Sequence, residues 1–121
     1  MSLDAAARRR YARQVLLGEI GATGQERLLD AEFVAGAAGD AGAFAVAADS
    51  LRRAGSSESV DGRAVAVPDR ASVIRFAGAS FLAQPATAVV GAFCAVEHLK
   101  ATLGISEARP FPAELRLSTE C

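Results

Sequence analysis

The chain has 121 residues, of which 51% are hydrophobic, and this composition suits one folded domain over residues 1–121 and excludes a disordered polypeptide. Its net charge is −1, so no excess of positive charge indicates a nucleic-acid partner. Cys94 and Cys121 form no CxxC pair, and the sequence predicts no zinc site. Much of the hydrophobic content is alanine, which buries little area per residue. We therefore expect the domain to associate with a second subunit.

Two helices are predicted at the N-terminus. The first covers residues 4–17, begins at the N-cap residue Asp4 and stops before Gly18. The second covers residues 24–30, because Thr23 opens a capping box with the glutamate three positions later.

A strand, a glycine-rich turn and a helix are predicted next. Residues 32–35 are short and apolar, as in a buried strand. Residues 36–42 are rich in glycine, and residues 43–54 have the pattern of a helix with Gly55 just after its end. This order is typical of the first half of a nucleotide-binding unit.

The second half of the chain is predicted to contain short strands and one long helix. The strands are expected over residues 60–62, 64–67, 72–76 and 114–117. The helix is expected over residues 88–103, with a terminator at Gly104. Its buried side is predicted to carry Val89, Phe93, Val96 and Leu99. Cys94 is expected to be buried, and His98, the single histidine, is expected to be exposed.

Residues 76–96 contain no charged side chain and are long enough to span a bilayer. Gln84 and Pro85 interrupt this run, and its small residues would insert weakly into a membrane. The N-terminus is charged and has no apolar stretch typical of a secretory signal. We therefore expect a cytoplasmic protein without membrane contact, and a membrane-associated protein is the alternative.

Four blocks of residues follow a known pattern. The first joins Arg13-Gln14 with Gly24-Gln25, and the second is the turn that begins at Gly36. The third is Val60-Asp61-Gly62-Arg63, and the last lies within residues 88–104. Together they resemble the E1-like adenylating enzymes of the ThiF/MoeB/HesA family, with the middle of the domain deleted. Those enzymes use ATP to activate the C-terminus of a small ubiquitin-like or sulfur-carrier protein.

The resemblance implies both a fold and a nucleotide site. The implied fold is a reduced Rossmann-like, three-layer α/β fold with a short, mainly parallel sheet and two N-terminal helices. In dimeric relatives, an arginine reaches the nucleotide of the other subunit, a glycine loop holds phosphate, and acidic residues at a strand end bind ribose and metal. If ATP binds to this chain, those contacts would fall to Arg13, Gly36, Gly39 and Asp61.

The chain also departs from the family pattern. Ala38 and Ala41 stand where the turn of relatives has glycines, and Asp40 adds a carboxylate beside the expected phosphate position. Arg63 replaces the second carboxylate of the V-D-x-D motif, and arginine does not ligate Mg²⁺. The sequence therefore predicts no catalytic residue, no metal ligand and no bound cofactor.

Two functions remain from this resemblance. The first is a catalytically degenerate E1-like protein that acts as a dimeric binding or structural partner. Its partner would be a second copy, a full-length E1-like enzyme, or a ubiquitin-like or sulfur-carrier protein. The alternative is a minimal adenylyltransferase that uses ATP and Mg²⁺ and is completed by a second subunit.

Overall fold

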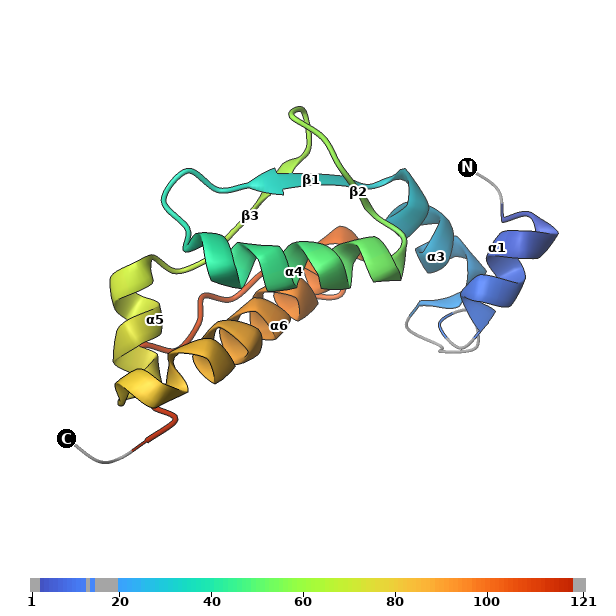
Figure 1. The fold of residues 1–121 in the computed structure, drawn as a ribbon. Helices are drawn as coiled ribbons and strands as arrows, with labels where there is room; N and C mark the ends of the chain where they lie inside the picture. Colours follow the sequence, from blue (N-terminus) through green and yellow to red (C-terminus); the bar gives the residue numbers. More distant parts are fainter. Residues whose placement is uncertain (1–2, 13, 15–19, 119–121) are drawn as a thin grey trace.

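The computed structural model describes residues 3–12, 14 and 20–118. Its elements in chain order are α1 (Ala5–Arg10), α3 (Gly21–Asp30), β1 (Glu32–Ala35), α4 (Ala41–Ala54), β2 (Ser57–Glu58), β3 (Arg63–Val65), α5 (Arg70–Ala77), the 3-10 helix η1 (Ser80–Leu82) and α6 (Ala83–Thr102) (Figure 1). The strands form one parallel sheet. The predicted fold class, a reduced Rossmann-like α/β fold with a short parallel sheet, is confirmed.

The sheet has the order β2-β1-β3, so that β2 and β3 lie on either side of β1. Phe33 of β1 is level with Glu58 of β2 and with Arg63 of β3. The connection over residues 59–62 must therefore cross β1, and Figure 1 shows it rising above the sheet. A Cβ atom on Gly62 would lie 2.6 Å from the backbone of Phe33, so the crossing requires a residue without a side chain.

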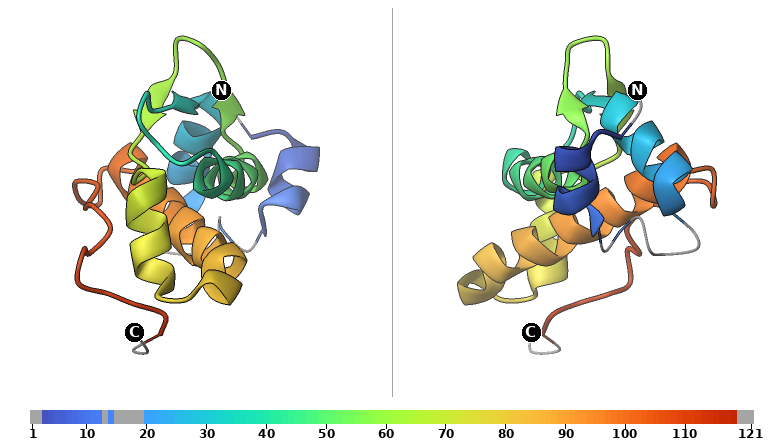
Figure 2. Two further views of the ribbon diagram at one scale, coloured as in Figure 1. Left: turned by 60° about the vertical axis from the view of Figure 1, so that its left-hand side comes forward. Right: turned by 90° about the vertical axis from the view of Figure 1, so that its right-hand side faces the viewer.

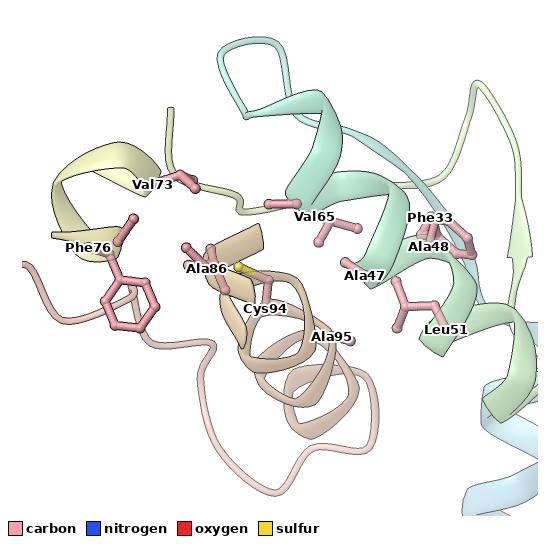
Figure 3. Close-up of a cluster of buried hydrophobic side chains, with 13 residues drawn as sticks. Phe33, Ala47, Ala48, Leu51, Val65, Val73, Phe76, Ala86, Cys94 and Ala95 are labelled. Carbon is pink, nitrogen blue, oxygen red and sulfur yellow. The ribbon is translucent and has the colours of Figure 1, made fainter. Parts of the chain in front are cut away.

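Two helices form successive layers on one side of the sheet. Helix α4 lies under the strands, and α6 packs against α4, as the views of Figures 1 and 2 agree. Strand, helix and loop residues meet in one core, in which Phe33, Leu51 and Val65 are completely buried (Figure 3). Most of the remaining core residues are alanines, which let the layers approach closely.

The N-terminal helices differ in extent from the prediction. Asp4 is the N-cap of α1, as predicted, and its side chain accepts a hydrogen bond from the Ala7 amide at 2.8 Å. Helix α1 ends at Arg10, and the predicted helix 4–17 runs on into residues outside the described part of the chain. The predicted cap at Thr23 is wrong: α3 begins at Gly21, because the Gly24 amide donates to the Ile20 carbonyl and adds a turn upstream.

The segment 72–76, predicted as a strand, is part of α5. The Asp69 carboxylate accepts a hydrogen bond from the Ser72 amide at 2.8 Å and starts a helix there. The apolar residues Val73 and Phe76 then lie one turn apart and both face the core. A short apolar run has no clear period, and the cap decided its conformation.

Two other predicted strands are also absent from the described residues. Residues 60–62 form a turn within the connection that crosses β1. Residues 114–117 are irregular and do not belong to the sheet β2-β1-β3. The Leu117 amide donates to the Phe76 carbonyl at 2.8 Å, so this segment follows α5 and does not extend the sheet.

Helix α6 begins five residues before the predicted start, at Ala83. The predicted buried side is correct in part, since Leu99 packs against the core and Phe93 is half-buried. Val89 and Val96 are exposed, whereas Val90 and Cys94 are buried. His98, predicted to be exposed, is also buried. The reason is that α6 is apolar around most of its circumference, so the sequence period does not define its inner side.

The segment Ser80–Thr102 is long and apolar enough to cross a membrane, judged by length and composition alone. Its most apolar window is 33% buried within the structure. The core helix of a soluble protein passes the same test, and α6 does bury one side against α4 and α5.

Candidate functional site

The turn between β1 and α4 contains two of the predicted site residues, Gly36 and Gly39. A Cβ atom on Gly36 would lie 2.9 Å from the Val65 carbonyl oxygen. A Cβ atom on Gly39 would lie 2.9 Å from the Val67 Cβ atom. Both glycines thus let the turn pack against the chain that leaves β3. This close approach accounts for both glycines without a ligand.

Two backbone amides of this turn, those of Gly39 and Asp40, have protein acceptors. The Gly39 amide donates to the Gly36 carbonyl at 3.4 Å, and the Asp40 amide donates to the Pro68 carbonyl at 2.8 Å. The Ala43 amide, in the first turn of α4, donates to the Asp40 carboxylate at 2.9 Å. A phosphate-binding turn directs such amides at its ligand. Here the protein itself uses the amides of Gly39, Asp40 and Ala43.

Asp40 places a negative charge at the N-terminus of α4. Its carboxylate is buried and caps the helix, and Arg70 Nη1 lies 3.5 Å from its Oδ1 atom. The positive end of a helix dipole stabilises an anion, and in this helix the anion is the protein's own side chain. A phosphate group in the same place would be repelled by it.

A hollow of about 350 Å³ lies beside this helix end. Gly42, Arg70, Gln84 and Thr87 are among the residues that line it. Its volume falls within the ~300–1,000 Å³ usual for small-molecule sites. Arg70 supplies positive charge there, although it also pairs with Asp40.

The other predicted site residues do not join this turn. Asp61 is exposed in the connection 59–62, where its amide donates to Ser59 Oγ at 3.3 Å. Figure 1 shows that connection above the sheet, whereas the turn with Gly36 and Gly39 leaves the end of β1. Arg13 lies outside the described residues. The structure therefore brings together the two glycines but not Asp61.

The Gly24-Gln25 part of the first block has a structural role. Gln25 is completely buried, and its Nε2 atom donates to the Ala54 carbonyl at 2.9 Å, at the end of α4. A Cβ atom on Gly24 would lie 3.2 Å from the Leu103 side chain. These residues attach α3 to the ends of α4 and α6.

Comparisons of the chain with protein-family models, with curated proteins and with solved structures found no match. The resemblance to the E1-like family thus rests on the four blocks of residues. Among the described residues, no group of three or more His, Cys, Asp or Glu side chains is placed to hold a metal ion.

Sequence reasoning missed one polar cluster, in which His98 and Glu97 of α6 lie buried near Arg63 of β3. Glu97 and His98 are neighbours in the sequence, and nothing in the sequence indicates that they join a buried cluster. Periodicity predicts neither the buried side of α6 nor its contact with β3. Arg63 itself was noticed only as a departure from the family pattern.

Proposed function

We propose that the protein is a catalytically degenerate relative of the E1-like enzymes, which acts in the cytoplasm as a dimeric binding partner and does not use ATP. The observation that carries this proposal is the Asp40 carboxylate on the N-terminus of α4. It gives the helix end a built-in anion, and the Gly39 and Asp40 amides of the preceding turn are engaged within the protein. Both features weaken the site on which ATP activation would depend.

An exposed apolar ridge supports the binding role. It runs along η1 and α6 and consists of Phe81, Pro85, Val89, Ala92 and Val96, spaced three or four residues apart. Phe81 is 77% exposed and Val96 is 55% exposed. Contiguous exposed apolar surface is typical of interaction sites. The proposed partner is a second copy, whose ridge would cover this one about a twofold axis, or an E1-like enzyme with a matching surface. A ubiquitin-like or sulfur-carrier protein would be a further partner of that assembly.

One observation favours the alternative, a minimal adenylyltransferase that uses ATP and Mg²⁺. The hollow beside α4 has the volume of a small-molecule site and carries Arg70. In that case Arg70, together with Arg13 of a second subunit, would supply the positive charge for the phosphates.

Thermal unfolding with increasing Mg-ATP distinguishes the two functions. We expect the same melting temperature with Mg-ATP as with magnesium chloride of equal ionic strength. A ligand that binds the native state stabilises it by ~2.7 kcal/mol at a hundred times its Kd. A melting temperature that rises with the logarithm of the ATP concentration would therefore refute the proposed function and favour the adenylyltransferase.

A further inference from the structure

A second cavity, remote in sequence from the glycine-rich turn, lies where β3 and α6 meet the chain that follows α6. Its volume is about 130 Å³. Arg63 of β3, Cys94, Glu97 and His98 of α6, and Arg109 of the following segment line it. Three separate parts of the chain thus direct polar side chains at one small space.

The imidazole of His98 lacks a protein partner in this cavity. The residue is 6% exposed, and no hydrogen bond joins its ring to another described residue, since Thr102 bonds only its backbone carbonyl. Burial, and then the charge of Arg63, lower the pKa of His98. The ring is therefore neutral at pH 7 and has one N–H donor and one acceptor to offer. Among the described residues, the ring is not one of the fully enclosed polar groups without a partner, so it is open to the cavity, where it can bond an occupant.

The charges around the cavity are unbalanced. Glu97 is buried, and its Oε2 atom lies 2.6 Å from Lys100 Nζ, so its charge is compensated within α6. Burial raises the pKa of the Cys94 thiol to about 11, so this side chain is neutral. Arg63 and Arg109 form no ion pair with any described residue. The lining therefore has two positive charges without a carboxylate partner among the described residues, on the exposed Arg63 and Arg109.

We propose that this cavity binds a small oxyanion, a phosphate or carboxylate group, which Arg63 and Arg109 hold by charge and to which His98 donates a hydrogen bond. A guanidinium group matches either oxyanion because it offers two parallel N–H donors. The cavity is smaller than the ~300 Å³ at which sites for drug-sized molecules begin. It therefore admits a single such group and not a whole nucleotide. This site shares no residue with the glycine-rich turn, and its test is independent of the proposed function.

The single histidine makes the site directly observable, because the chain has one imidazole and hence one set of ring C–H signals in an NMR spectrum. The full chain is titrated with inorganic phosphate and, separately, with acetate, at constant ionic strength set by sodium chloride. We expect a saturable shift of the ring signal and a rise in the pKa of His98, because a bound anion stabilises the imidazolium form. Saturation by phosphate alone assigns a phosphate group, and saturation by acetate alone assigns a carboxylate. A ring signal that responds to neither anion would overturn the proposal.

Variants separate a site from a general salt effect. Arg63→Gln is expected to weaken anion binding at least about tenfold, equivalent to ~1.4 kcal/mol. It should also raise the pKa of His98 in the free protein, because a nearby positive charge is removed. Arg53→Gln is the matched control, since Arg53 is exposed on α4 and pairs with Asp49. Arg109→Gln, in the irregular segment after α6, provides a second loss variant if Arg63→Gln does not fold. Equal affinity in the loss variants and the control would contradict the proposed site.

Discussion

Asp40 stabilises the first turn of α4 through two contacts of unequal weight. Its Oδ2 atom accepts the Ala43 amide at 2.9 Å, whereas Arg70 lies 3.5 Å from Oδ1 and has a side chain that is 60% exposed. An exposed arginine contributes little through such a pair. A helix cap contributes ~1 kcal/mol, so the hydrogen bond to the amide is the main contribution.

We therefore predict that Asp40→Ala lowers the free energy of unfolding by about 1 kcal/mol, because it removes the cap of a helix in the core. Asp40→Asn should retain most of the stability, since asparagine caps helices about as well as aspartate. Urea denaturation measures both. Asp4→Ala is the control: it removes a similar cap from α1, which buries none of its residues. The loss of stability should be smaller in Asp4→Ala than in Asp40→Ala. Equal losses would show that burial of α4 does not increase the cost of removing its cap.

The glycines of the candidate site show that a sequence motif does not by itself establish a binding site. The resemblance to the E1-like family assigns Gly36 and Gly39 to phosphate contacts, yet a Cβ atom on either would lie 2.9 Å from the chain at or after the end of β3. The sequence predicted that side chains must be absent there. It could not tell which atoms fill the space, because those atoms come from the end of β3 and the segment just after it, about thirty residues along the chain.

At the scale of elements, the contact between α4 and α6 sets which side of α6 is buried. A Cβ atom on Gly91 would lie 2.6 Å from both the Ala43 carbonyl oxygen and the Val46 Cβ atom. The helix axes can be this close only because α6 has no side chain at that point. The packing then leaves Val89 and Val96 on the outer side.

We predict that Gly91→Ala destabilises the protein by about 1–3 kcal/mol, the usual cost of overpacking a core. This loss would outweigh the gain of up to ~1 kcal/mol that alanine brings to a helix interior. Ala45→Gln, at an exposed position of α4 outside the ridge, is the control and should change stability by less than ~0.5 kcal/mol. Thermal or urea unfolding gives both values. A Gly91→Ala variant more stable than the parent would mean that α4 and α6 are not in close contact.

At the scale of the whole molecule, the outer layer formed by η1 and α6 has an exposed apolar side. Nearly half of the core residues are alanines, and the ridge on η1 and α6 stays exposed. Burial of such a ridge by a partner would add apolar area that the single chain lacks, at ~25 cal/mol per Å². Association of two copies is therefore the arrangement that we propose.

We predict that the protein is at least a dimer at micromolar concentration and that Val96→Asp converts it to a monomer with an unchanged circular dichroism spectrum. The charge would lie within the ridge and would lose its hydration in the contact. Light scattering measures the mass. Val60→Asp is the matched control, because Val60 is 90% exposed in the connection between β2 and β3, away from the ridge. A monomeric parent protein, or a dimeric Val96→Asp variant, would contradict this assembly.

The sequence by itself determined those elements whose start, end or type depends on residues close together in the chain. The caps at Asp4 and Gly55, the strand β1 and the α/β class follow from such signals. The local cap at Asp69 decided that residues 72–76 form a helix, whereas the tertiary structure alone decided that α6 turns Val96 outward and that His98 is buried beside Arg63. An apolar helix fits more than one orientation against its neighbours. Contacts between distant segments select one of them, and those contacts are not encoded in any single stretch of sequence.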